Sequence, residues 1–105
     1  MTSGFGLVVR FELRDAEAAK AFDALVEETL KGIRAHEPGT LLYVVHAVPD
    51  EPNTRLFYEL YADRAAFDQH EQQEHTRRFL AEREKYVAEL SVTFVQSQSS
   101  AGVWT

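Results

Sequence analysis

Near its start the chain alternates regularly between apolar and polar side chains. Apolar residues fall on one side of an extended segment: Phe5, Leu7, Val9, Phe11 and Leu13. Charged residues fall on the other side: Arg10, Glu12 and Arg14. A period of two residues predicts a β-strand over residues 5–14 with one face on the protein core.

The next segment changes to a helical period. Asp15 is the expected N-cap, and apolar residues then recur at intervals of three and four: Phe22, Leu25, Val26, Leu30 and Ile33. Gly32 costs the helix about 1 kcal/mol relative to Ala. Pro38 disfavours helical backbone at Glu37. A helix is therefore predicted over residues 16–36.

Residues 40–48 and 54–61 are rich in β-branched and aromatic side chains and are apolar on both faces. The turn-forming stretch 49–53 between them predicts an antiparallel hairpin. In the second strand, Leu56, Tyr58 and Leu60 share one side, and Phe57, Glu59 and Tyr61 share the other. A buried Glu59 would need a partner, and Arg10 or Arg55 is the expected one.

Two further helices and a strand are predicted in the remaining part. Asp63 is expected to cap a short helix that carries Ala66, Phe67 and His70. A longer helix is predicted from about Thr76, because six residues recur at helical spacing: Phe79, Leu80, Arg83, Tyr86, Val87 and Leu90. The final strand is predicted over residues 91–97. The tail, residues 97–105, is expected to be extended or exchanged with a partner subunit, with Trp104 reaching that partner.

The element order is β-α-β-β-α-β, which predicts one α+β domain over residues 1–105 with a ferredoxin-like, four-stranded antiparallel sheet. The helices would cover one face of this sheet. The other face carries the second apolar side of residues 40–61, and a large exposed apolar surface usually pairs. We therefore expect a homodimer in which two sheet faces pack around a twofold axis. The alternative is that these residues are only good strand formers.

Composition excludes several classes of partner and site. The 105 residues carry a formal charge of −6 and scattered basic residues, so neither nucleic acid nor an anionic membrane is an expected partner. The absence of cysteine excludes disulfides, thiolate metal sites and a cysteine nucleophile. The apolar stretch at residues 5–9 is too short for a signal peptide or a membrane span, so a cytoplasmic location is expected.

Residues 37–80 carry a set of short motifs in a specific order. Glu37-Pro38-Gly39 precedes a strand with Tyr43, the sequence Tyr58-Glu59-Leu60-Tyr61 ends the next strand, and His70, His75 and Phe79 follow. This order resembles the antibiotic biosynthesis monooxygenase family, although the last aromatic of the strand motif is often Trp in the family and is Tyr61 here. The resemblance covers nearly the whole chain.

The resemblance implies a dimeric α+β barrel with a ligand pocket between sheet and helices in each subunit. It also implies oxidation of a quinol or polycyclic phenol by O2 without metal or flavin, so no cofactor is expected. Such chemistry needs a base for a phenolic proton and groups that stabilise the anion. Some members of the family are sugar-phosphate isomerases, and others have no assigned activity, so membership alone does not fix the reaction.

Histidines and tyrosines are the candidate site residues. His75 is the preferred acid or base, and Tyr58 and His46 are the other catalytic candidates. The candidates for substrate binding are Tyr43, Tyr61, Phe22, Phe67, His70 and Phe79. Each also has a structural interpretation: His75 could cap its helix, His46 could be an interface histidine, and the aromatics could be core residues. On one continuous helix His70 and His75 would lie ~140° apart, which disfavours a metal site.

Two other functions are compatible with the same fold. A heme-degrading relative would need an Asn on the first strand and a Trp in the pocket, and neither is present at those places. A non-catalytic dimeric domain that binds a small aromatic molecule would show ligand-induced stabilisation without O2 consumption.

Overall fold

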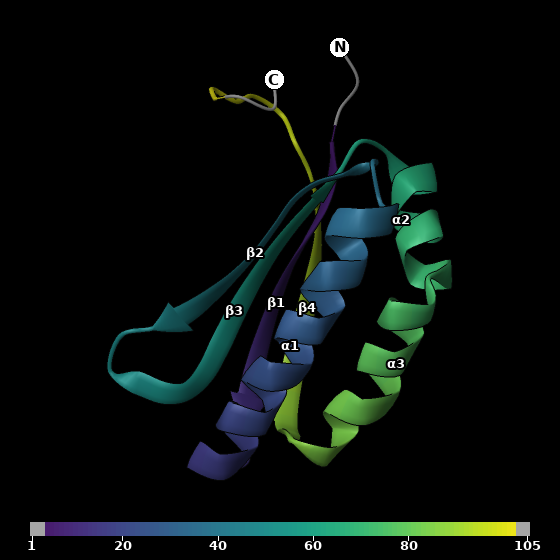
Figure 1. Cartoon of the computed structure of the whole chain (residues 1–105). Helices are drawn as coiled ribbons and strands as arrows, with labels where there is room; N and C mark the ends of the chain where they lie inside the picture. The colour runs from purple at the N-terminus through teal and green to yellow at the C-terminus, as the bar shows by residue number, and fades with distance from the viewer. Residues whose placement is uncertain (1–3, 103–105) are drawn as a thin grey trace.

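A computed structural model describes residues 4–102, and its strands form one antiparallel sheet in the order β2-β3-β1-β4. In chain order the elements are β1 (Phe5–Leu13), α1 (Ala16–His36), β2 (Thr40–Val48), β3 (Glu51–Tyr61), α2 (Arg64–Gln72), α3 (Glu74–Glu82), the 3-10 helix η1 (Arg83–Lys85) and β4 (Val87–Gln96). The helices lie on one face of the sheet, and the β2–β3 hairpin extends past α1 (Figure 1). The predicted ferredoxin-like α+β fold is confirmed.

Both predicted helix caps are present. Asp15 accepts a hydrogen bond from the backbone N–H of Ala18 at 2.7 Å, and Asp63 accepts one from Ala66 at 2.8 Å. Each bond satisfies a backbone donor that the first helical turn leaves unpaired. The bounds predicted for the first helix, 16–36, agree with α1.

The core lies between the helices and the inner face of the sheet. Its centre is a cluster of phenylalanine rings from four elements: Phe11, Phe22, Phe57 and Phe79. The centroids of Phe11 and Phe57 are 4.7 Å apart in an edge arrangement, and those of Phe11 and Phe22 are 5.1 Å apart. Tilted and edge contacts of this kind add to the free energy that burial of the rings supplies.

The long helix predicted from Thr76 to Leu90 is wrong in its second half. The helix ends at Glu82, and Val87 and Leu90 belong to β4. In β4, Val87 pairs with Leu13 and Leu90 pairs with Phe11. Pairing with β1 satisfies the backbone of this segment through the sheet, and this tertiary contact overrides the local helical spacing. The final strand therefore spans ten residues and begins before residue 91.

The β2–β3 turn is tighter than the predicted 49–53 loop. β3 begins at Glu51, which pairs with Val48, so only Pro49 and Asp50 form the turn. Asp50 has φ of 70°, a left-handed conformation that Asp tolerates better than most residues. The hairpin itself was predicted correctly.

The second, open face of the sheet carries a row of apolar side chains. In the strand register, Val44 and Val8 both lie opposite Tyr58, and His46 lies opposite Leu56. Successive side chains of a strand point to opposite faces of the sheet. The residues next to Val8, Val44 and Tyr58 in sequence face the core, so these three side chains point away from the helices. The two-sided apolar pattern predicted for residues 40–61 is thus realised as two distinct faces.

Ser97, the first residue of the predicted tail, bonds to its own chain. Its backbone N–H donates to the carbonyl of Gly4 at 3.0 Å, and its hydroxyl accepts from the Gly4 N–H at 2.6 Å. Trp104, which was expected to reach a partner, lies outside the described residues.

Candidate functional site

Glu37 stands between two histidines at the end of α1. One carboxylate oxygen, Oε1, lies 2.7 Å from Nδ1 of His70 and 2.7 Å from the hydroxyl of Thr40. The other oxygen, Oε2, contacts Nε2 of His75. The side chains of Glu37 and His70 are only 4% and 5% exposed, so this carboxylate is solvated by protein groups rather than by water.

Three elements are needed to build this cluster. Glu37 is the C-cap of α1, where Pro38 ends the helix and turns the chain into β2. α2 brings His70 and α3 brings His75. A Cβ atom at Gly39 would lie 2.7 Å from the Cβ of Ala66, so a glycine lets the loop after Glu37 approach α2.

The hydrogen bonds of Glu37 decide its charge. Burial raises the pKa of this carboxyl, but the hydrogen bonds from His70, Thr40 and His75 outweigh burial and lower the pKa to about 2. Glu37 is therefore a carboxylate at neutral pH. A buried negative charge is stable only with compensating donors or positive charge, which makes the two rings electrostatic partners of Glu37.

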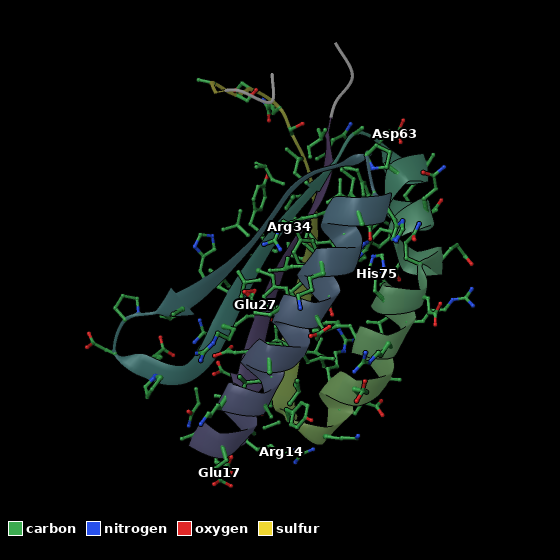
Figure 2. All side chains as sticks on the ribbon, viewed as in Figure 1. Arg14, Glu17, Glu27, Arg34, Asp63 and His75 are labelled. Carbon is green, nitrogen blue, oxygen red and sulfur yellow. The ribbon has the colours of Figure 1, made fainter. Side chains whose placement is uncertain are left out.

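His75 faces an outer groove of about 500 Å³ between α1 and α3. The residues that line it are Leu25, Glu28, Thr29, Gly32, His36, Gln73, Glu74, His75 and Arg78. The His75 side chain is 14% exposed, and its ring stacks near that of His36 with centroids 6.4 Å apart. Figure 2 shows His75 between α1 and α3.

His70 faces a second space, an inner cavity of about 160 Å³ between the sheet and α2, α3 and η1. The lining combines apolar and aromatic side chains with a few polar groups. Its polar members are Tyr43, Glu59, His70, Glu71, Thr76 and Arg83. The His70 ring centroid is 5.7 Å from that of Tyr43 and 5.2 Å from that of Tyr61. A cavity that combines an aromatic lining with convergent polar groups has the composition of a small-molecule site, and its volume is below the roughly 300–1,000 Å³ common for such sites.

Glu59 is buried and bonds to a neighbour on its own strand. It accepts a hydrogen bond of 2.6 Å from the hydroxyl of Tyr61, so the predicted pairing with Arg10 or Arg55 is wrong. Arg10 lies on the open face, and Arg55 pairs with Asp23. Burial raises the pKa of Glu59, and it also raises the pKa of Tyr61.

Arg83 supplies the cation of the inner cavity. Its guanidinium lies 5.8 Å from the ring centroid of Phe11 and 5.9 Å from that of Phe79. Partial burial lowers the pKa of Arg83, although the group stays charged at neutral pH. The sequence did not indicate Arg83 as a site residue, because Arg83 was assigned to the middle of a helix. Glu37 was assigned no chemical role, although it belongs to the Glu37-Pro38-Gly39 motif.

The predicted site residues separate into four places. Tyr43, Phe67, His70 and Phe79 line the inner cavity, and Tyr61 is buried beside His70. His75 is on the outer groove, joined to the cavity through Glu37. Tyr58 and His46 lie on the open sheet face, and Phe22 is fully buried in the core. The structure therefore does not bring the three predicted catalytic residues, His75, Tyr58 and His46, together.

Within residues 4–102, no group of three or more His, Asp or Glu side chains is placed to hold a metal ion. The helices of the same range include none that is long and apolar enough to cross a membrane.

Comparisons with known proteins agree with this architecture. The family described as antibiotic biosynthesis monooxygenase matches residues 4–82. A solved structure from Mycobacterium tuberculosis, Rv0793, superposes with a TM-score of 0.84 at 23% identity, covering 94% of this chain and 99% of the other. A candidate antibiotic biosynthesis monooxygenase from Bacteroides thetaiotaomicron gives 0.84 at 23% identity over 95% and 93% of the two chains. One from Caulobacter crescentus gives 0.85 at 19% identity over 92% of each chain. A search of curated proteins gave no match.

Proposed function

The chain belongs to the antibiotic biosynthesis monooxygenase family, and on that premise we propose that it is a cofactor-independent monooxygenase. Its substrate is a quinol or a polycyclic phenol, and its oxidant is O2. The reaction takes place in the inner cavity, where the bound phenol loses a proton and the resulting electron-rich anion reacts with O2. The protein supplies binding, a base and stabilisation of the anion.

The observation that carries this proposal is the placement of His70. Its Nδ1 is held by Glu37 at 2.7 Å, and its ring lines the cavity beside Tyr43. When Nδ1 carries a proton and donates to Glu37, Nε2 is left with a lone pair that can accept a substrate proton. His70 therefore takes the role of base. His75, which the sequence favoured, acts on the other side of Glu37.

Arg83 and Tyr43 stabilise the anion. Arg83 contributes a positive charge at the cavity wall, and the flanking Phe11 and Phe79 rings shield it from water. Burial raises the pKa of Tyr43 well above its ordinary value, so its hydroxyl stays protonated and can donate a hydrogen bond. Preorganised donors of this kind act strongly where water is excluded.

We propose also that the protein is a homodimer through the open sheet face. The row formed by Val8, Tyr58 and Val44 offers apolar side chains on three adjacent strands. Val44 is 37% exposed in the single chain. A twofold pair would bury this row against its own copy, which is the self-complementary contact that a symmetric dimer requires.

Oxygen consumption tests the enzymatic proposal. Wild-type protein with menadiol or anthrone should consume O2 above the autoxidation rate, and mass spectrometry after reaction under ¹⁸O2 should find the label in the anthrone product. His70→Gln should lose about a hundredfold in kcat, the lower range of what a positioned base contributes. His36→Gln is the matched control, since His36 is exposed at the end of α1.

Equal O2 uptake by wild type, His70→Gln and buffer would exclude a monooxygenase for these substrates. Thermal stabilisation by a phenol without O2 uptake would support the non-catalytic binding domain instead.

A further inference from the structure

Glu37 connects two spaces that lie on opposite sides of the helical layer. His70 lines the inner cavity and His75 lines the outer groove, while neither lines both. The two rings contact different oxygens of the same carboxylate. The chain from cavity to groove is therefore His70, Glu37 and His75, with protein hydrogen bonds throughout.

Each histidine contacts Glu37 through one ring nitrogen only, which leaves the other nitrogen available to a different partner. His70 bonds to Glu37 through Nδ1, which also lies 3.4 Å from the hydroxyl of Thr76. His75 bonds through Nε2. Within residues 4–102, Nε2 of His70 and Nδ1 of His75 make no hydrogen bond to protein, so these atoms can exchange protons with a cavity ligand and with groove water.

We infer that Glu37 holds a single positive charge that is shared between His70 and His75, so that proton uptake at His70 from the cavity is balanced by proton release from His75 to the outer groove. Two imidazolium rings on one buried carboxylate would leave an uncompensated positive charge, and two neutral rings would leave an uncompensated negative one. One positive charge on the two rings balances the Glu37 carboxylate and leaves the cluster neutral.

The proton balance follows from this arrangement. In the resting state His75 is the imidazolium, Glu37 is the carboxylate and His70 is neutral with its proton on Nδ1. The substrate O–H bond breaks, its proton binds Nε2 of His70, and the electron pair stays on the phenolate oxygen. His75 then releases its Nδ1 proton to water in the groove. Glu37 stays ionised throughout, and its bond to His75 Nε2–H is kept.

Other charged groups surround both ends of this chain. On the cavity side, β3 contributes the Glu59–Tyr61 pair, β2 contributes Tyr43, and α2 contributes Glu71. Arg83 of η1 also faces the cavity. These groups bring both signs of charge to the His70 side.

On the groove side, α1 contributes Glu28 and His36, and α3 contributes Glu74 and Arg78. None of these four groups hydrogen-bonds to Glu37, whose partners within residues 4–102 are Thr40 and the two histidines. The charge balance is thus set by the cluster itself.

The use of this pair in catalysis rests on the proposed function, whereas the shared charge does not. His70 touches the substrate, and Glu37 and His75 are positioning residues that keep His70 ready to accept a proton. Ring ¹⁵N NMR of the full chain reads the shared charge directly, since neutral and imidazolium rings have different nitrogen shifts. The same samples serve for oxygen-uptake measurements.

The NMR experiment compares three proteins at neutral pH. In wild type, one imidazolium signature is expected for the pair, on His75. In His75→Gln, which retains an amide donor for Glu37, the signature should move to His70. In Glu37→Gln, neither ring should carry it. An identical His70 spectrum in wild type and His75→Gln, or two imidazolium rings in wild type, would overturn the shared charge. Thermal unfolding identifies a variant that fails to fold, and His75→Asn replaces His75→Gln in that case.

The kinetic experiment uses His75→Ala with menadiol. Loss of the outgoing proton path should lower kcat about a hundredfold without a matching change in KM, and added imidazole should restore kcat by entering the space left beside the groove. Arg34→Ala, which changes an exposed residue in the last turn of α1 outside the groove lining, should keep wild-type kcat.

The possible results separate the two proposals. If wild type oxidises menadiol and His75→Ala is equally fast, the catalytic use of the pair is wrong and the monooxygenase assignment stands. If wild type shows no oxidation while the NMR signature moves to His70 in His75→Gln, the proposed function fails for this substrate and the shared charge stands.

Discussion

A Cβ atom at position 32 of α1 would lie 2.4 Å from Cγ and Nδ1 of His75 on α3. Gly32 and His75 fit together only because position 32 has no side chain. A glycine inside a helix is unfavourable by about 1 kcal/mol relative to Ala. The contact explains why one is tolerated here: it lets the imidazole reach Glu37, the C-cap of the same helix.

Gly32→Ala should therefore destabilise the protein, although helix propensity alone predicts a gain. Overpacking against the His75 ring is expected to cost about 1–3 kcal/mol. Urea unfolding followed by circular dichroism measures the change in the free energy of unfolding.

The double variant Gly32→Ala/His75→Ala is the control for this prediction. Without the ring, the alanine should be more stable than glycine in the His75→Ala background by about 1 kcal/mol. The same loss in both backgrounds would show that His75 is not the cause.

Protonation of Glu37 should make the protein less stable at low pH. The pKa of Glu37 is about 2 in the folded chain against 4.5 ordinarily, so the folded state binds fewer protons between these values. Its contribution, up to about 3 kcal/mol, is fully present above pH 4.5 and is lost as the pH falls through 2.

In Glu37→Gln this part of the pH dependence should disappear, and the free energy of unfolding should change less between pH 5 and pH 2. Glu27→Gln, which removes an exposed carboxylate of α1, controls for the loss of one negative charge. Parallel curves for wild type and Glu37→Gln would contradict the assignment.

Tyr61→Phe should destabilise the protein by about 1–3 kcal/mol, because it removes the only hydroxyl donor to the buried Glu59 within residues 4–102. The loss should be greater at pH 8 than at pH 4, since an ionised Glu59 depends more on its donor. Chemical unfolding at the two pH values measures both effects.

Relative to wild type, Glu59→Gln should have a pH dependence of stability opposite to that of Glu37→Gln. Burial raises the pKa of Glu59, so the folded state binds more protons than the unfolded chain. The stability contributed by protonated Glu59 is present below its ordinary pKa and is lost as the pH rises through the raised value. The variant should therefore gain stability relative to wild type as the pH rises, and a constant difference would argue against a raised pKa.

Val44→Glu should convert the proposed dimer to a monomer. The substitution places a charge in the apolar row beside Tyr58, where a symmetric contact would bury it twice. Ala24→Glu adds the same charge to an exposed position of α1 and should leave the dimer intact. Sedimentation velocity measures the mass of each protein, and a monomeric wild type would contradict the proposal.

The candidate site was only partly predictable for a physical reason. His70 and His75 could be selected as chemistry-bearing residues, but their five-residue spacing on one continuous helix argued only against a shared metal site, and it gave no sign of a shared carboxylate. The helix is interrupted at Gln73, between α2 and α3. This change of direction lets both rings face Glu37. Neither residue spacing nor composition contains the position of that carboxylate, which comes from another helix.

The sequence by itself determined the elements whose signals are local. Alternation identified β1, Asp15 and Asp63 marked two helix starts, Pro38 marked the end of α1, and the two-sided apolar strands indicated a sheet with a second contact surface. Only the tertiary structure decided the rest. Pairing with β1 made a strand of residues that have helical spacing, and the meeting of α1, α2 and α3 joined Glu37 to two histidines. Local periodicity encodes which face of an element is apolar, whereas the partners of a buried charge depend on contacts between segments far apart in the chain.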